Sequence, residues 1–452
     1  MKIIIVGCGK VGTTLAAQLN AEGHNVTIID QDPIKVKTVA NKLDIMGVIG
    51  NGASRTTQKD AGVDRTDLLI AVTGNDELNL LSCLVAKKSS NCRTIARLRD
   101  PEYNMDAPYF KNELGLAMVI NPELAAAREI SRILNFPTAI KIETFAKGRV
   151  ELLKFKLPEG CRLVGMSIKD VAMKLKCSVT FCTIERGEDE AYIANGNFVF
   201  EEKDVVSIIA SPQGAKAFFK KIDYQIQPVK DALIVGGGPI TYYLCELLEN
   251  SGIACTVVEK DIDLCNTLAS EFEKVTVIHG DPSDEDVLRE EGVSRADAFV
   301  ALTGIDEENI LLSLFAKKSG AGKILTKINR IDFDNIISQL ELDSIIYPKN
   351  ITADTIIGYV RAMKNTNGSN VETVYNIIKG KVEAAEFTIG ESSPVVGKAI
   401  MHLSLKEGVL IAAIRRGRTQ ITPHGQDVIL AGDSVVVVTK GLAVKDIKDI
   451  LK

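Results

Sequence analysis

The sequence has little of what several specialised classes of protein need. It has no tryptophan and only 4 histidines. No apolar run approaches the ~18 residues that span a bilayer, and the longest runs, at 3–6 and 435–438, have the length of a strand. Met1-Lys2 leads directly into a strand pattern, so we expect no secretory signal. These absences argue against a membrane-spanning protein and leave few groups for acid–base catalysis.

Charge and cysteine content narrow the class further. A formal net charge of -5 at pH 7 argues against a nucleic-acid-binding surface as the main function. The 9 cysteines include no C-x-x-C pair, and the ten-residue steps between Cys245, Cys255 and Cys265 match no metal-ligand spacing. We therefore expect reduced, mostly buried thiols that act as small apolar residues, and no metal site.

What the sequence does contain is a long internal repeat. Matching segments are separated by 229 residues at the glycines and by 230 residues further along. Three pairs recur: IIIVGCG (3–9) with LIVGGG (233–238), TGNDELN (73–79) with TGIDEEN (303–309), and AKKS (86–89) with AKKS (316–319). Two nearly collinear copies predict an even number of domains and favour a sensor built from pairs over an ordinary enzyme.

Each copy begins with apolar strands that alternate with amphipathic helices. In the first copy we expect strands at 2–6, 25–30, 45–49, 68–72 and 93–98, and helices at 10–22, 33–43, 54–61, 76–88 and 123–134. Continuous apolar strands of this kind predict a parallel sheet covered on both faces. From about residue 140, and again from about 372, the segments become short and extended with turn signals between them, which predicts a small α+β module.

The predicted fold class is therefore α/β, with two Rossmann-like parallel-sheet domains that are each followed by a small α+β module. The expected domains are 1–139, 140–223, 231–368 and 369–452. Residues 224–230, which include Pro228, form the expected linker between the copies.

A glycine loop in the first copy predicts a dinucleotide site. Gly7-Cys8-Gly9-Lys10-Val11-Gly12 fits G-x-G-x-x-G and stands between an expected strand and an expected helix. Gly7 makes the tight turn, Gly9 lets the backbone approach the pyrophosphate, and Gly12 lets the helix lie close to the sheet. The helix N-terminus supplies free N–H groups and a positive dipole for the phosphates.

An acid at the end of the next strand completes the pattern. Asp30 follows Gly12 by 18 residues, and its carboxylate would accept hydrogen bonds from the adenosine ribose hydroxyls. The residues after it, Gln31-Asp32-Pro33, contain no arginine that could accommodate a 2′-phosphate. The cofactor is therefore expected to be NAD(H) rather than NADP(H).

The second copy keeps only part of this pattern. Gly236, Gly237 and Gly238 keep the turn and the close approach, and Glu259 keeps the acid. Pro239 replaces Lys10 and precedes Ile240, and Thr241 replaces the third glycine. Proline suits a first helical turn, so the helix is expected to survive. Two interpretations stay open: a nucleotide site of weaker or altered preference, or a copy kept only for pairing.

Residues at the ends of the fourth and fifth strands are further candidates, because the carboxyl ends of parallel strands line the ligand crevice. Thr73-Gly74 ends the fourth strand, and Thr303 is its equivalent in the second copy. Thr73 either binds the nucleotide or belongs to the start of the next helix. Arg97 ends the fifth strand, with Lys327 in its place in the second copy; each either reaches a phosphate or is a surface charge.

No set of catalytic residues accompanies the nucleotide pattern. The two small modules contain only His402 and His424 and no constellation that occurs in both. No G-x-x-x-x-G-K-[ST] loop is present. We therefore expect no enzyme. The competing hypotheses are an NAD-dependent dehydrogenase with an internal duplication and a redox-sensing transcription regulator.

The motifs resemble a known family, the regulatory domain of potassium conductance (RCK, also called KTN). In the first copy the resemblance rests on GCGKVG (7–12) with Asp30, NGAS (51–54), VTGNDELN (72–79) and ARLRDPEY (96–103). The small modules resemble the C-terminal module of that family through GMSIKD (165–170), VGKAI (396–400) and AGDSVVVV (431–438). The resemblance covers essentially the whole chain.

Two such pairs in one chain resemble the tandem members of the family, which are peripheral subunits of Trk-type potassium uptake systems. The resemblance implies a cytoplasmic ring, expected to be a tetramer, on the inner face of the cell membrane under an integral-membrane potassium-translocating subunit (TrkH/TrkG-like). It also implies that NAD(H), or ATP or ADP in the same kind of site, gates potassium transport by changing the conformation of the ring. The implied contacts are Gly7 to Val11, Asp30, Thr73, Gly74 and Arg97, and then Gly236 to Ile240, Glu259 and Thr303.

Overall fold

The computed structural model describes residues 1–452 except 146–149, 188–189, 225–227, 330–336, 338–339, 341, 365–370, 379–380, 443 and 445. Residues 225–227 of the expected linker 224–230 and the expected boundary at 368–369 lie outside the described residues. The chain divides into two compact units, and each is built from both copies of the repeat. The first unit contains Met1–Ser131 and Lys230–Ile357, and the second contains Arg132–Val229 and Gly358–Lys452.

The first half of the first unit is a six-stranded parallel sheet with the strand order β3-β2-β1-β4-β5-β6. Its strands are β1 (Lys2–Val6), β2 (Asn25–Asp30), β3 (Met46–Ile49), β4 (Leu68–Ala71), β5 (Arg93–Arg97) and β6 (Met118–Ile120). The sequential order of the strands reverses between β1 and β4, which run parallel, and open α/β sheets bind their ligands outside the carboxyl ends of the strands at such a switch point. The prediction of a Rossmann-like parallel sheet is confirmed.

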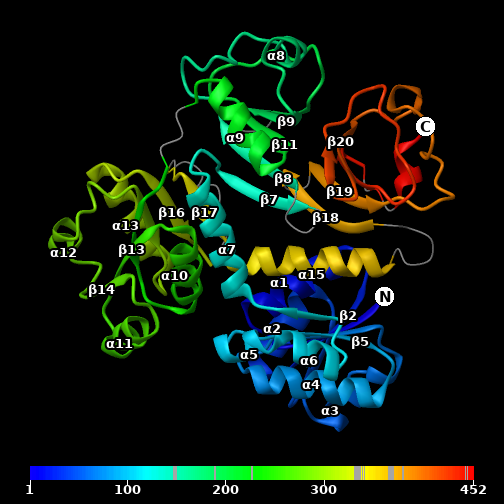
Figure 1. The fold of residues 1–452 in the computed structure, drawn as a ribbon. Coiled ribbons are helices and arrows are strands. Elements are labelled where there is room, and N and C mark those ends of the chain that lie inside the picture. Colours follow the sequence, from blue (N-terminus) through cyan, green and yellow to red (C-terminus); the bar gives the residue numbers. More distant parts are fainter. Residues whose placement is uncertain are drawn as a thin grey trace. The chain divides into compact units, whose positions relative to one another are not determined.

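Helices cover both faces of this sheet because its strands are apolar on both sides. The helices of this copy are α1 (Lys10–Ala21), α2 (Pro33–Leu43), α3 (Arg55–Asp60), α4 (Asp76–Ser89), α5 (Pro101–Met105), α6 (Ala107–Glu113) and α7 (Pro122–Asn135), the last of which ends in the second unit. In Figure 1, α1 and α4 lie on opposite sides of the strands. The residues 3–6 and 68–71 are at most 1% exposed, which explains why these strands read as continuous apolar runs.

The second half of the first unit repeats the plan, with the order β14-β13-β12-β15-β16-β17. Its strands are β12 (Asp231–Val235), β13 (Ala254–Glu259), β14 (Val275–His279), β15 (Ala298–Ala301), β16 (Lys323–Lys327) and β17 (Ser344–Ile346). Its helices are α10 (Pro239–Ser251), α11 (Ile262–Glu271), α12 (Glu285–Glu290), α13 (Asp306–Ser319) and α15 (Pro348–Lys364). The two copies therefore form the same sheet twice within one unit.

The second unit holds the two small modules, each built on an antiparallel sheet. The first has the order β10-β9-β11-β8-β7, from β7 (Lys141–Phe145), β8 (Val150–Lys156), β9 (Val179–Arg186), β10 (Glu190–Ile193) and β11 (Val205–Ala210), with α8 (Ile168–Leu175) and α9 (Pro212–Lys221). The second has the order β18-β19-β22-β20-β21, from β18 (Val371–Ile378), β19 (Val382–Thr388), β20 (Val409–Arg416), β21 (Thr419–Ile421) and β22 (Ser434–Lys440). The prediction of two small α+β modules is confirmed.

The two modules share one hydrophobic core. A single cluster of buried side chains takes Phe145, Val150, Leu152, Cys182 and Ile209 from the first module and Ile377, Val382, Ala384, Ala412, Ala413, Val436 and Val438 from the second. A hydrogen bond of 2.5 Å from Lys440 Nζ to the carbonyl oxygen of Ala191 also joins them. The modules are therefore packed as a pair inside one chain, as the doubled sequence suggests.

All 9 cysteines are free thiols, and 7 of them are buried. Their burial agrees with the prediction of mostly buried thiols that act as small apolar residues. Among the described residues, no helix combines the length and hydropathy that a bilayer crossing requires.

An arginine–aspartate pair is repeated in both modules. Nε and Nη2 of Arg186 donate to the two carboxylate oxygens of Asp204, each at 2.8 Å, and Arg416 binds Asp433 in the same way at 2.9 and 2.8 Å. The side chains of Asp204 and Asp433 are 0% and 1% exposed, and each also accepts a backbone N–H, from Glu201 and Leu430 respectively. The pairs fix the turn before the final long strand of each module.

We expect the substitution Asp204→Ala to destabilise the second unit by about 2–3 kcal/mol. The change removes the buried bidentate partner of Arg186. The cost stays at the lower end for buried pairs because Arg186 is 28% exposed and keeps its contacts with Glu201 at 2.5 Å and with the carbonyl oxygen of Val199 at 3.0 Å. Thermal unfolding followed by circular dichroism measures the effect. Glu159→Ala is the control: Glu159 and Lys203 form an ion pair at 74% and 71% exposure, and its loss should change stability by less than about 0.5 kcal/mol. Equal melting temperatures for the two variants would contradict the assignment.

Candidate nucleotide-binding sites

The first glycine loop follows the carboxyl end of β1, at the point where the strand order reverses between β1 and β4. β1 ends at Val6, and Gly7 has a φ of 112°, in the left-handed region that favours glycine. A Cβ atom on Gly7 would stand 3.1 Å from backbone atoms of Val72 and Thr73. Both the conformation and the close backbone neighbour therefore require glycine at this turn.

The other two glycines have different roles. A Cβ on Gly12 would lie 1.9 Å from the carbonyl oxygen of Gly7, so the helix can approach the strand only without a side chain there. A Cβ on Gly9 would meet nothing within 4 Å. Gly9 is the N-cap of α1 and provides no side-chain cap to the helix N-terminus. The open space at Gly9, in front of a helix N-terminus, is where an anionic phosphate would fit.

Asp30 is held at the rim of this loop. Its Oδ2 accepts the backbone N–H of Cys8 at 2.6 Å, and its Oδ1 accepts the backbone N–H of Asp32 at 3.0 Å. The carboxylate is half-buried, and these two bonds point it at the loop. Burial raises the pKa of the Cys8 thiol to about 12, with the charge of Asp30 acting in the same direction, so the loop carries a neutral thiol at physiological pH.

The second glycine loop keeps the backbone path with different side chains. Gly236 has a φ of 96°, and a Cβ on it would lie 2.9 Å from the backbone of Leu302 and Thr303. Thr241, which replaces the third glycine, is 0% exposed and donates from Oγ1 to the carbonyl oxygen of Gly236 at 2.5 Å. A hydrogen bond therefore takes the place of the close backbone contact that Gly12 allows in the first copy.

The acid of the second copy is more enclosed than that of the first. Glu259 is 8% exposed; its Oε2 accepts the N–H of Gly237 at 2.5 Å and its Oε1 accepts the N–H of Asp261 at 2.7 Å. Pro239 is the first residue of α10, and Ile240 behind it is 7% exposed. The loop, helix and acid are thus assembled in the second copy, but the carboxylate is less accessible and the cation beside the phosphates is absent.

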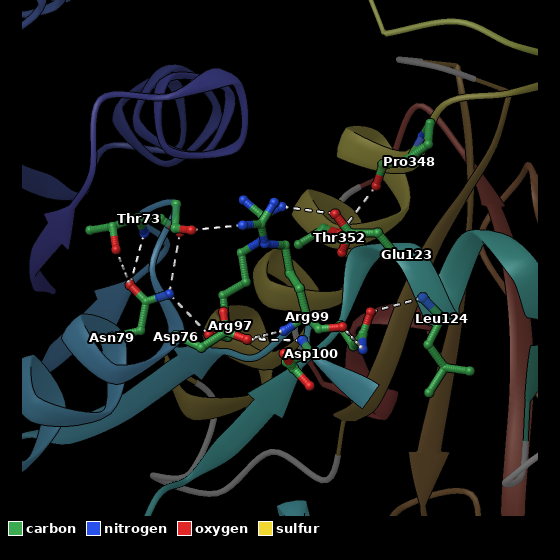
Figure 2. A network of polar contacts seen from close by, with 12 residues as sticks. Thr73, Asp76, Asn79, Arg97, Arg99, Asp100, Glu123, Leu124, Pro348 and Thr352 are labelled. Atoms are coloured by element: carbon green, nitrogen blue, oxygen red, sulfur yellow. Dashed lines mark hydrogen bonds and ion pairs between the residues drawn. The ribbon is translucent and has the colours of Figure 1, made fainter. Parts of the chain in front are cut away.

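Thr73 stands at the end of the fourth strand, with its hydrogen-bonding groups already engaged. Its backbone N–H and its hydroxyl both donate to Oδ1 of Asn79, at 2.8 and 2.7 Å (Figure 2). Nδ2 of Asn79 donates to the carbonyl oxygen of Arg97 at 2.9 Å. Asn79 is 0% exposed and so joins the ends of β4 and β5. Gly74, next to Thr73, is exposed and open.

The bonds between the asparagine and the backbone recur in the second copy, where the hydroxyl of Thr303 donates to Oε2 of Glu308 at 2.9 Å. The N–H of Thr303 donates to Oδ1 of Asn309 at 2.8 Å, and Nδ2 of Asn309 donates to the carbonyl oxygen of Lys327 at 3.0 Å. These two asparagines were not among the expected site residues. Their signal was the last position of the repeated TGNDELN and TGIDEEN segments.

Arg97 forms a partly buried ion pair rather than an isolated surface charge. Its Nη2 lies 3.0 Å from Oε1 of Glu123, and the two side chains are 14% and 15% exposed. Burial lowers the pKa of Arg97, the carboxylate of Glu123 opposes that change, and neighbouring Arg99 adds to it. Figure 2 shows the two arginines side by side, and Arg99 Nη2 donates to the carbonyl oxygen of Gly74 at 2.6 Å.

Lys327, the counterpart of Arg97, binds backbone instead. Its Nζ donates to the carbonyl oxygen of Leu302 at 2.9 Å. Burial lowers the pKa of the Lys327 amine; Asp306 opposes this, and the charge of Lys10 in the first copy lowers the pKa further. The strand ends of the second copy and the glycine loop of the first are therefore close enough to interact electrostatically.

The fold and the two loops define the class of protein: a tandem protein with two Rossmann domains of the dinucleotide-binding type, each followed by a small module. Family models agree with this division. The TrkA-N domain matches residues 3–122 and 232–348, and the TrkA-C domain matches residues 152–223 and 384–452. The chain belongs to the TrkA family of Trk system potassium uptake proteins.

Relatives match over the full length. The "Trk system potassium uptake protein TrkA homolog 1" of Methanosarcina mazei is 31% identical, and the match covers 100% of both chains. The "Trk system potassium uptake protein TrkA" of Haemophilus influenzae is 32% identical over 97% of this chain and 95% of its own. These relatives are named as transport-system proteins and not as enzymes, in agreement with the expectation from the missing catalytic residues.

Solved structures share the fold. The GsuK channel superposes with a TM-score of 0.67 at 15% identity, over 99% of this chain and 77% of that chain. The GsuK channel bound to NAD superposes with a TM-score of 0.66 at 15% identity, over 97% of this chain and 77% of that one. At this identity the likeness shows the common architecture.

We expect the substitutions Gly12→Ala and Gly9→Ala to separate folding from binding. Gly12→Ala places a methyl group 1.9 Å from the Gly7 carbonyl oxygen, and should lower both the melting temperature and nucleotide affinity. Gly9→Ala meets nothing and has an allowed φ of -72°, so it should leave the melting temperature within about 2 °C while it weakens nucleotide binding. Differential scanning fluorimetry and calorimetric titration with NADH measure the two effects. Equal stability losses in both variants would contradict the roles assigned to the glycines.

Proposed function

We propose that the chain is the cytosolic nucleotide-binding regulatory subunit of a Trk-type potassium uptake transporter, in which NAD(H) or ATP/ADP binding changes the conformation and gates potassium transport. The observation that carries the proposal is a complete glycine loop with an anchored acid, in a protein whose relatives are named Trk system potassium uptake proteins. Fold neighbours add support, since GsuK structures are described as bound to NAD and to ADP.

In the proposed first site, the phosphates bind at the N-terminus of α1 and the ribose binds at Asp30. The residues proposed to form this site are Gly7, Cys8, Gly9, Lys10, Val11, Gly12, Asp30, Thr73, Gly74 and Arg97. Lys10 is exposed at the first position of α1 and supplies a cation. The hydroxyl of Thr73 is bound to Asn79, so we assign Thr73 to shaping the turn and exposed Gly74 to backbone contact with the ligand.

The proposed second site is an unequal partner. Its residues are Gly236, Gly237, Gly238, Pro239, Ile240, Glu259 and Thr303. Glu259 is 8% exposed, no cation follows the loop, and Lys327 binds a carbonyl oxygen. We therefore propose weaker binding or a different nucleotide preference in this copy. Two inequivalent sites give the protein two separate inputs.

The proposed assembly is a homo-oligomeric ring, a tetramer, on the inner face of the cell membrane. It would contact an integral-membrane potassium-translocating subunit (TrkH/TrkG-like). The proposed domains are 1–139, 140–223, 231–368 and 369–452, with the nucleotide-binding domains separate from the small modules. Regulation then requires that each nucleotide bind two conformations of the ring with different affinity.

We expect the substitution Asp30→Ala to reduce NADH affinity at the first site by at least about 10-fold. The change removes the acceptor for the ribose hydroxyls, and hydrogen bonds to a charged group contribute about 1.5–3 kcal/mol each. Calorimetric titration of the full chain measures this loss. Glu259→Ala, the equivalent change in the second copy, is the matched control and should leave the tighter binding event in place. Unchanged NADH binding by the Asp30→Ala protein would overturn the first site.

We expect the full chain to retain a polytopic potassium-transporting protein when it is isolated from membranes of its own host. The proposed role places the chain against such a partner, since no described helix could cross the bilayer itself. The measurement is affinity capture from detergent-solubilised membranes, followed by potassium flux in vesicles with and without NADH. Substrate-dependent oxidation of NADH by the purified chain, without capture of a transporter, would favour the dehydrogenase hypothesis instead.

A further inference from the structure

We propose that Tyr243 couples the second nucleotide site to the first, and that the coupling passes through Arg99. The inference rests on the proposed nucleotide function and adds a route for regulation to it. The observations that carry it are hydrogen bonds between the two halves of the first unit, which place one side chain of the second copy among the strand-end residues of the first copy.

Tyr243 lies in the helix that would bind the second nucleotide. α10 starts at Pro239, directly after Gly238, and Tyr243 is its fifth residue. The side chain is 2% exposed. Its hydroxyl donates to the carbonyl oxygen of Arg99 at 2.7 Å and accepts from Nδ2 of Asn121 at 2.9 Å. The buried hydroxyl therefore donates one hydrogen bond and accepts another, and both partners belong to the first copy.

Arg99, which accepts the hydrogen bond from Tyr243, lies at the rim of the proposed first nucleotide site. The guanidinium of Arg99 donates from Nη2 to the carbonyl oxygen of Gly74 at 2.6 Å, and the backbone N–H of Arg99 donates to Oδ2 of Asp76 at 2.7 Å (Figure 2). A shift of α10 must therefore either move Arg99 or break a buried hydrogen bond. Because Arg99 is bound to Gly74, a movement of Arg99 reaches the turn where the first nucleotide is proposed to bind.

The residues at the equivalent positions, with the two copies exchanged, make different contacts. The position equivalent to Tyr243 in the first copy is Thr14, whose hydroxyl donates to the carbonyl oxygen of Lys10 at 2.9 Å, within its own helix α1. The position equivalent to Arg99 is Asn329, whose N–H and Nδ2 both bind Oδ1 of Asp306 at 3.0 Å. The Tyr243 connection is therefore specific to one of the two equivalent positions.

This geometry assigns Tyr243 a positioning role that acts through Arg99. A ligand bound at α10 that moves this helix changes the free energy of nucleotide binding at the first site. Because coupling is reciprocal, a nucleotide at the first site changes the free energy of binding at the second site by the same amount. Couplings of this kind typically change affinity ~5-fold to ~150-fold. The size of the change is what the experiment measures.

The experiment determines a coupling factor in the full chain, with NADH as the probe. The factor is the ratio of the NADH dissociation constants of the first site in two proteins: the Glu259→Ala protein, in which the second site is disabled, and the intact chain with both sites filled. Two-site calorimetric titration gives both constants. We expect a factor of at least ~5, in either direction, for the wild-type sequence and a factor below ~2 in the Tyr243→Phe protein.

Thr14→Val is the matched control, because Thr14 is the equivalent residue and its hydroxyl, among the described residues, bonds within α1. It should keep the wild-type factor. Melting temperatures of all variants are recorded, because a purely structural role for Tyr243 would lower stability without moving the coupling factor. A factor that is unchanged in Tyr243→Phe, or equal to 1 in the wild type, overturns the inference while the first site stands. The proposed function fails separately, if Asp30→Ala binds NADH as the wild type does.

Discussion

The close approach of backbone to backbone inside the glycine loop is the constraint on which each nucleotide half depends. β1 is almost fully buried between β2 and β4, so it cannot shift to make room for a side chain on the returning helix. A Cβ at Gly12 would lie 1.9 Å from the Gly7 carbonyl oxygen, which leaves no space for any other residue in this geometry. Because of this contact, α1 starts just beyond the carboxyl end of β1, and the N–H of Cys8 donates to the carboxylate of Asp30. The proposed phosphate and ribose positions are both consequences of this packing.

The second copy satisfies the same constraint by another route, and this makes the duplication informative. Thr241 replaces a glycine, yet its hydroxyl bonds to the carbonyl oxygen of Gly236 and the loop retains its left-handed turn. The second copy therefore has the same turn and an acid, Glu259, while the cation of the first copy is replaced and the carboxylate is less exposed. A chain with two identical sites would report one signal twice. A chain with two different sites that are coupled through Tyr243, as we propose, is suited to combine two signals.

Pairing of the copies occurs in both units by different means. In the second unit, the two modules share an apolar core, which is the kind of contact that stabilises a permanent pair. In the first unit, polar contacts such as that between Tyr243 and Asn121 cross between the copies. Buried hydrogen bonds depend on direction, so a small change of orientation breaks them more readily than it disrupts an apolar core. The nucleotide halves are therefore the part of the chain in which we place the response to ligand.

The sequence by itself determined the fold class, most of the long elements and the composition of both glycine loops, because these depend on residues close together in the chain: strand 25–30 and helix 33–43 have the bounds expected. It did not reveal α5, α6 or β6, since these elements are 3 to 7 residues long, and the two helices have no buried face that would give a periodic pattern. Only the tertiary structure decided that Arg97 pairs with Glu123 and that Tyr243 binds Arg99, a residue 144 positions away. Such partners come into contact because folding brings the strand ends together, and the spacing of residues along the sequence does not predict these contacts.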